Sequence, residues 1–218
     1  KSFITDSTKI SYKTEYDILE NFHHKEKNRF IKMHPHLFLP PHDLSIYIDG
    51  NIEVLSDLRV LIEKVMESEG NIFLYQHPLR NCIYDEALAC VETANEYIWR
   101  ISRQMKRYRT EGFPENQGLF EGNVIVRKND TQVKELMKFW WEEYKNGAKR
   151  DQLSLVYCSY KLKIPINSLG LSNVRSDNVD FFLDLSKRER KIKLENHLVR
   201  FSNAFLSKII KKNTIIGH

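Results

Sequence analysis

The 218-residue chain has few cysteines, no long apolar run and no secretory leader pattern. Its three cysteines, Cys82, Cys90 and Cys158, are widely spaced and odd in number, so they predict neither a zinc site nor a disulfide framework. No run of about 18 apolar residues occurs, which predicts no transmembrane helix. The first residues also lack the basic-then-apolar order of a secretion signal. We therefore expect reduced thiols and a cytoplasmic location.

Internal repeats and low-complexity linkers are also missing, and the only shift in composition is a basic C-terminal segment. Residues 187–212 hold nine Lys or Arg against two Glu, so a net charge of +7 lies there and −2 elsewhere. Basic charge confined to one terminus argues against nucleic acid as a partner. We expect one domain over residues 1–186 and a helical extension over 187–218. That extension could be a solvated helix, pack against a partner, or give peripheral membrane contact.

Short apolar runs alternate with amphipathic stretches along the chain. Strands are predicted at residues 2–5, 45–48, 71–76 and 123–127. Helices are predicted at residues 58–65, 84–108 and 133–144, and again after residue 192 with a break near 202–203. This alternation predicts an α/β fold in which ligands bind at strand ends.

Polar side chains of one kind follow the predicted strands. In chain order they are Asp6, Arg29, Lys32, Asp49, Asn51, His77, Arg80, Glu121, Asp151 and Gln152. Carboxylate and amide oxygens suit Mg²⁺ or Mn²⁺, and Arg and Lys donate to phosphate oxygens, so the set suits a diphosphate with a divalent cation. Asp49-Gly50-Asn51 is also the composition of an ordinary tight turn, and the sequence leaves both readings open.

Five ordered motifs resemble one family. They are D-L-S-I-Y-I-D-G-N-I-E-V, Q-H-P-L-R-N-C-I-Y-D-E-A, Y-R-T-E-G-F-P-E-N-Q-G-L-F-E-G-N-V-I-V-R, F-W-W-E-E-Y and R-D-Q-L-S-L. They are similar to the glycosyltransferase-like domain of plant mucilage and turgor-related proteins and bacterial polysaccharide proteins. That resemblance runs from about Phe3 to Leu162. It implies a GT-A-type fold, a nucleoside diphosphate sugar donor, with UDP expected as the nucleotide, and a glycan hydroxyl as acceptor.

The resemblance also implies roles for individual residues. Arg29 and Lys32 match an R-x-x-K expected near the donor, and His77 and Arg80 match an H-P-x-R loop expected beside the donor sugar. We place Asp6 and Glu121 on the donor side as well. Asp49 and Asn51 match the metal-binding D-x-D position, and Asp151 with Gln152 match an R-D-Q on the acceptor side. Asp151 would be the general base of an inverting enzyme. In a retaining enzyme it would orient the acceptor or stabilise the oxocarbenium-like centre.

The chain departs from the family pattern at two points. Asn51 replaces the second carboxylate of D-x-D, so a further ligand is needed, and His197 is the candidate. The opening strand and glycine-containing loop of the family have no counterpart. Either the chain begins late or the base is held differently.

Two rival functions and several plainer readings remain open. A nucleotidyltransferase would need a glycine-rich N-terminal loop, which is absent, whereas a catalytically degenerate domain that binds glycans or partners would fit Asn51. Trp140 and Trp141 lie in an apolar stripe, so at least one belongs to the core. Glu86 reads as structural. His34, His36 and His42 lie in a proline-rich loop and read as solvated or capping residues.

Overall fold

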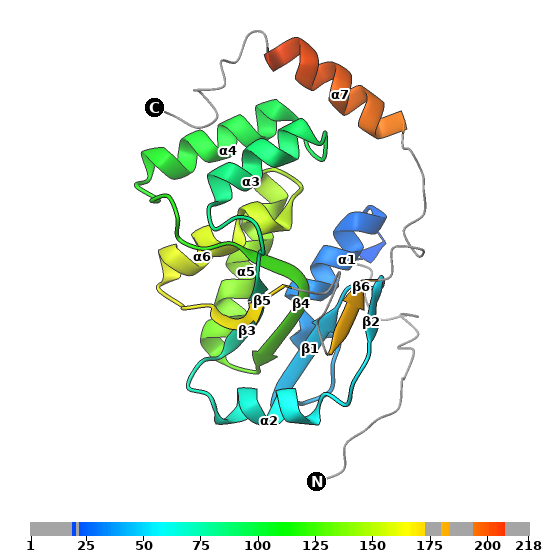
Figure 1. Cartoon of the computed structure of the whole chain (residues 1–218), viewed down its shortest axis with the longest axis vertical. Helices are drawn as coiled ribbons and strands as arrows, with labels where there is room; N and C mark the ends of the chain where they lie inside the picture. The colour runs from blue at the N-terminus through cyan, green and yellow to red at the C-terminus, as the bar shows by residue number, and fades with distance from the viewer. Residues whose placement is uncertain (1–18, 21, 173–179, 184–193, 208–218) are drawn as a thin grey trace.

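The computed structural model describes residues 19–20, 22–172, 180–183 and 194–207 (Figure 1). The predicted strand at residues 2–5 and Asp6 therefore lie outside the described residues. Helices and strands are mixed along the chain, and the predicted α/β fold is confirmed. None of the helices in the described ranges is long and apolar enough to cross a membrane.

The main sheet has four strands in the order β1-β4-β3-β5. Their bounds are β1 Leu44–Ile48, β3 Ile72–Gln76, β4 Phe120–Lys128 and β5 Asn167–Leu171. β4 runs antiparallel to both β1 and β3, and β5 runs parallel to β3. β1, β3 and β4 match predicted strands, whereas β5 was not predicted.

Several candidate residues lie together at one end of the strands of this sheet. Because β4 runs opposite to its neighbours, its first residues lie beside the last residues of β1 and β3. The Asp49 amide donates to the Asn123 carbonyl at 2.8 Å, and the His77 amide donates to the Leu119 carbonyl at 2.8 Å. The segments 49–51, 77–80 and 119–123 therefore meet at this end of the sheet, which we call the site edge.

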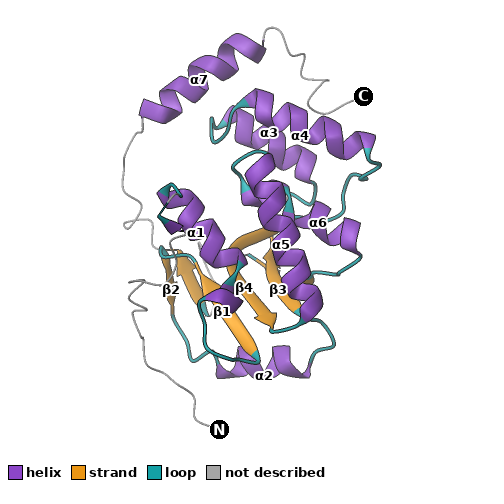
Figure 2. Cartoon of the chain, turned by 180° about the vertical axis from the view of Figure 1, so that it is seen from behind, coloured by secondary structure: helices purple, strands orange, loops and turns teal. Residues whose placement is uncertain are grey.

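The two faces of the sheet carry separate apolar cores. Five helices contribute to the larger core, which also contains Ile125. They are α1 His24–Met33, α3 Ile83–Glu92, α4 Ile98–Thr110, α5 Thr131–Asn146 and α6 Leu155–Leu162 (Figure 2). On the other face, Val124 and Val126 pack with α2 Arg59–Glu67 and a small antiparallel pair, β2 Ile52–Val54 and β6 Phe181–Leu183. Alternate residues of β4 thus serve different layers.

The helix predicted over residues 84–108 is wrong, because the chain forms α3 and α4 with a break between them. Ala94 adopts a left-handed conformation with φ 52°, and the Asn95 amide donates to the Cys90 carbonyl at 2.9 Å. A left-handed residue with such a bond ends a helix. Glycine usually fills that position, so alanine gave no signal in the sequence.

The C-terminal helix α7 spans Leu194–Ser207, and the predicted break near residues 202–203 does not occur. Asn203 is buried and bonds the α3–α4 connection. Its Oδ1 accepts from the Ile98 amide at 2.8 Å, and its Nδ2 donates to the Glu96 carbonyl at 3.1 Å. The asparagine that suggested a helix break therefore holds α7 to α4 (Figure 1).

Candidate functional site

Asp151 lies at the centre of the candidate site. It opens the short 3₁₀-helix Asp151–Leu153 and is buried. The Lys32 ammonium lies 2.5 Å from its Oδ2, and the Arg29 Nε lies 2.9 Å from the same oxygen. Lys32 and Arg29 are one turn apart on α1, so they project from the same face of the helix. The predicted R-x-x-K and R-D-Q residues are thus brought together.

Lys32 is only 1% exposed, which is unusual for a lysine. Its ammonium lies 5.3 Å from the Tyr47 ring centre and 5.4 Å from that of Trp140, within the range of cation–π attraction. The backbone passes close by at Gly122, where a β-carbon would lie 2.7 Å from the ammonium. This glycine leaves room for the Lys32–Asp151 pair, a role that the sequence did not indicate.

Opposing effects set the protonation of this cluster. Burial alone would raise the pKa of the Asp151 carboxyl, but Lys32 and Arg29 hold that pKa well below its usual range. Burial lowers the pKa of Lys32, against the opposing effect of Asp151. For Arg29, burial would lower the pKa, but Asp151 and Asp49 outweigh it and raise it. Asp151 is therefore an anion held between two cations.

Asp49 and Asn51 lie in the turn that joins β1 to β2. The Ile52 amide donates to the Asp49 carbonyl at 2.8 Å, so Asp-Gly-Asn forms a tight turn, and its role in metal binding stays a prediction. The Tyr47 hydroxyl donates to Asp49 Oδ1 at 2.7 Å. Asp49 is also close enough to raise the pKa of both Arg29 and Lys32. The turn thus presents its carboxylate to the cations of α1.

A second buried carboxylate, Glu86 on α3, organises the loop after β3. The Arg80 Nε donates to Glu86 Oε2 at 2.8 Å, and the Arg150 Nη2 lies 4.0 Å from Oε1. His77 Nδ1 accepts from the Arg80 amide at 3.1 Å, which shapes the His77–Arg80 loop. These contacts agree with the prediction that Glu86 has a structural role. The residue also orients Arg80 and Arg150.

The carboxylates of Asp151 and Glu86 are linked through the backbone, because Arg150, which pairs with Glu86, directly precedes Asp151. Each of them pairs with two cations: Asp151 with Arg29 and Lys32, and Glu86 with Arg80 and Arg150. The Arg150 Nε is buried and has no hydrogen-bond partner among the described residues. A buried donor of this kind is able to bind an anionic ligand.

A hollow of about 270 Å³ opens at the end of β3. His77, Arg80, Asn81, Gly118 and Leu171 are among its lining residues. Arg29, Lys32, Asp49 and Asp151 do not line it. The loop predicted to lie beside the donor sugar therefore borders a concave surface of its own.

The remaining predicted site residues have mainly internal contacts. Glu121 is buried on β4 and accepts from Asn123 Nδ2 at 3.0 Å and from the Ser172 hydroxyl. Gln152 Nε2 donates to the Phe120 carbonyl at 3.2 Å. His197 belongs to α7, but its side chain lies outside the described ones, as does Asp6. Both Trp140 and Trp141 are core residues.

The protein donors for a divalent cation are few. The described residues contain no group of three or more His, Cys, Asp or Glu side chains that could hold a metal. A carboxylate has about four lone-pair positions, and the Tyr47 hydroxyl uses one of those on Asp49. Asp49 and Asn51 therefore fit a cation that takes its other ligands from phosphate oxygens, and do not fit one held by protein alone.

The family model described as TOD1/MUCI70, glycosyltransferase-like domain, matches residues 19–195. This range extends past Leu162, where the motif resemblance faded. No curated protein and no solved structure matches the chain.

Proposed function

Because the chain belongs to the TOD1/MUCI70 glycosyltransferase-like domain family, we propose that it is a metal-dependent glycosyltransferase. It would move a sugar, of the hexosyl or deoxyhexosyl class, from a nucleoside diphosphate sugar to a hydroxyl of a glycan. The donor nucleotide that we propose is UDP. The cations gathered at the site edge support a diphosphate ligand, because charge-assisted hydrogen bonds from Arg and Lys are the usual means of binding phosphate oxygens.

The observation that carries this proposal is the meeting of residues from three distant segments. Arg29 and Lys32 come from α1, Asp49 from the end of β1, and Asp151 from the segment after α5, and all lie within electrostatic reach of one another. Structural packing alone does not need a buried lysine, since burying a charge is costly. A site that binds a doubly charged leaving group does need such cations.

We propose that Asp49 and Asn51 would hold Mg²⁺ or Mn²⁺ together with the diphosphate. When bound there, the cation would stabilise negative charge on the departing diphosphate. Arg29 would add a guanidinium directed at the same group. Its side chain is about a quarter exposed, so it can reach a ligand while its Nε stays on Asp151.

Asp151 is better suited to positioning than to taking a proton. A general base works best when its pKa lies near the working pH, and two cations hold the Asp151 pKa far lower. We therefore do not favour the general-base role, and propose instead that Asp151 positions Lys32 and Arg29, a role that differs from the predicted contact with the acceptor. This role is compatible with a retaining reaction.

A second candidate function is a catalytically degenerate domain that binds glycans or partners. The incomplete set of metal ligands among the described residues favours it. The two candidates differ in turnover but not in fold.

A screen of nucleotide sugars for Mn²⁺- or Mg²⁺-dependent hydrolysis separates the two candidates. The proposed function expects release of nucleoside diphosphate from at least one donor, loss of release in EDTA, and loss in Asp49→Asn. Asp43→Asn is the matched control, because Asp43 is an exposed carboxylate at the other end of β1. Metal-dependent binding of a donor without any release would favour the degenerate domain.

A further inference from the structure

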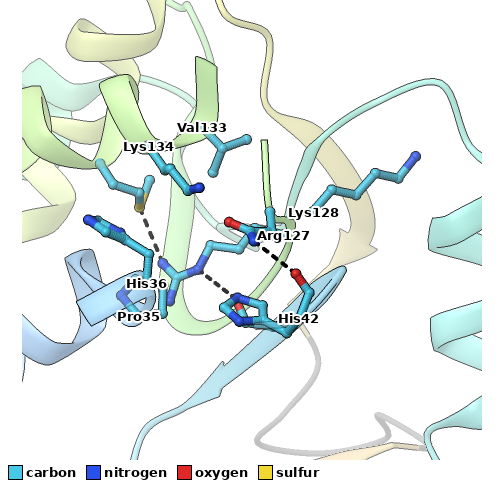
Figure 3. A pocket seen from close by; sticks show the side chains of 10 residues that line it. Pro35, His36, His42, Arg127, Lys128, Val133 and Lys134 are labelled. Atoms are coloured by element: carbon cyan, nitrogen blue, oxygen red, sulfur yellow. Dashed lines mark hydrogen bonds between the residues drawn. The ribbon is translucent and has the colours of Figure 1, made fainter. Parts of the chain in front are cut away.

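A small positively charged hollow lies on the helix-covered face of the sheet, below the end of β4 (Figure 3). Its charged or titratable lining residues are Arg127, Lys128, Lys134, His36 and His42, and none of the residues that line it is acidic. The volume of the hollow is about 10 Å³, which is about what one water molecule needs. The hollow therefore admits a single small group.

Arg127 is the central feature of this hollow. It is only 3% exposed, and no acidic side chain among the described residues pairs with it. Its Nε donates to the Ser45 hydroxyl at 3.1 Å, and its Nη1 donates to the Lys32 carbonyl at 2.7 Å. The Ser45 hydroxyl and the Lys32 carbonyl are neutral, so they accept hydrogen bonds from the guanidinium but do not balance its positive charge. Burial lowers the pKa of Arg127 to about 9.

The neighbouring side chains add positive charge to the same place. Figure 3 shows His36, His42 and Lys134 around the Arg127 guanidinium. Lys128 extends away and donates to the Ser68 carbonyl, so it contributes less. Burial, Lys134, Arg127 and His42 all lower the pKa of His36. A buried cation without a counter-charge costs several kcal/mol, and nothing acidic in the hollow offsets that cost.

We propose that this hollow is a binding site for a small monoatomic anion of the chloride class. The Arg127 guanidinium would be its main contact and Lys134 a second cation. A phosphate or sulfate group is larger than the water-sized space, so the site would be separate in chemistry from the diphosphate site. Because Arg127 Nη1 donates a hydrogen bond to the Lys32 carbonyl, the anion would lie near the C-terminal end of α1.

The test is a titration of chloride with the purified chain at pH 7.5, followed by the ³⁵Cl NMR linewidth. Wild-type protein should broaden the line, and bromide should reverse the broadening whereas sulfate at equal ionic strength should not. Lys134→Ala should weaken binding about tenfold. Lys138→Ala is the matched control, because Lys138 is exposed one turn further along α5 and does not line the hollow.

Arg127→Met should abolish the binding. Because this variant could fail to fold, Lys134→Ala with its control carries the decision. Absence of broadening in the wild type would overturn the proposal and leave Arg127 as a hydrated core residue. Equal loss in Lys134→Ala and Lys138→Ala would also overturn it, since the effect would then belong to the general surface charge.

Discussion

Lys32 joins the fold to the proposed chemistry. The sequence places this residue near the donor, and the structure shows that it is also buried and paired with Asp151. Removing one member of a buried ion pair leaves the other uncompensated, which costs about 3–5 kcal/mol. Arg29 stays on Asp151 and offsets part of that cost. Lys32 therefore serves both stability and binding.

Replacing Lys32 should show both roles. Lys32→Met should lower the free energy of unfolding by about 2–4 kcal/mol, because Asp151 loses its nearest cation. It should also weaken binding of a nucleoside diphosphate at least tenfold, since a charge-assisted hydrogen bond contributes about 1.5–3 kcal/mol. Urea denaturation and calorimetry measure the two effects. A variant with wild-type stability would contradict the buried pair.

Asp151 should make the free energy of unfolding decrease as the pH falls into the acid range. Its folded pKa lies below the unfolded value near 3.8, so the unfolded state binds the proton more readily in that range. The stabilisation is present above about pH 5 and is lost as the pH falls toward the folded pKa. Asp151→Asn should therefore lose less stability than the wild type between about pH 5 and pH 3.

Denaturation curves at several pH values measure this slope. Asp43→Asn, which removes an exposed carboxylate, should keep the wild-type slope. If Asp151→Asn also kept it, the carboxylate would not be held as an anion by Lys32 and Arg29.

The two glycines near the site provide a matched comparison. An alanine β-carbon at Gly122 would lie 2.7 Å from the Lys32 ammonium, whereas one at Gly50 would have no neighbour within 4 Å. Gly122→Ala should displace Lys32 from Asp151 and weaken nucleotide binding about tenfold, while Gly50→Ala should change it less than twofold. Calorimetry of both variants decides, and equal affinities would show that the backbone at Gly122 does not support the site.

At the level of elements, periodicity predicted α2, α5 and α7 and the strands β1, β3 and β4, but it did not predict α1 or α6. β4, for example, has the consecutive apolar residues Val124, Ile125 and Val126 that are expected of a strand with apolar cores on both faces. The break between α3 and α4 could not be predicted, because its left-handed residue is Ala94. Nor could the role of Asn203, since its partners are about a hundred residues away.

Contacts between residues that are distant in the sequence also limited the prediction of the site. The sequence indicated Arg29, Lys32, Asp49 and Asp151 by residue type and motif, but gave no sign that Gly122 borders Lys32. Tyr47 was also missed, although it lies in β1 only two residues before Asp49 and its hydroxyl donates to the Asp49 carboxylate. Glu86 was recognised only as structural, because its pairing with Arg150 spans distant segments.

Asn203 should make α7 part of the stable fold. Asn203→Ala would leave the Ile98 amide and the Glu96 carbonyl without their partner, and each buried unsatisfied group costs about 1–3 kcal/mol. For the two groups together, urea denaturation should show a loss of about 2–6 kcal/mol. Ser202→Ala, a change at the adjacent residue, should alter stability by less than about 0.5 kcal/mol. Identical stabilities would mean that α7 only rests on the surface.

At the scale of the whole molecule, the net charge of +5 comes from the C-terminal segment. Leu198 and Phe201 lie on α7 and are 61% and 77% exposed, with Arg200 exposed between them. Exposed apolar residues beside basic ones are typical of helices that rest on anionic lipid. We propose peripheral membrane contact at this surface.

Vesicle flotation tests that contact. The double variant Leu198→Ser, Phe201→Ser should reduce binding to phosphatidylserine vesicles several-fold, because apolar insertion and basic attraction act together. Val60→Ser is the control, since Val60 is 75% exposed on α2. Unchanged flotation of the double variant would assign α7 to a solvated surface.

The central claim is that the site edge binds a nucleoside diphosphate jointly with a divalent cation. Calorimetry of UDP with wild type and with Asp49→Asn, each in Mn²⁺ and in EDTA, tests it most directly. We expect wild-type binding to be at least tenfold tighter in Mn²⁺ than in EDTA, and Asp49→Asn to bind equally weakly in both. Equal wild-type affinity with and without the cation would contradict the claim.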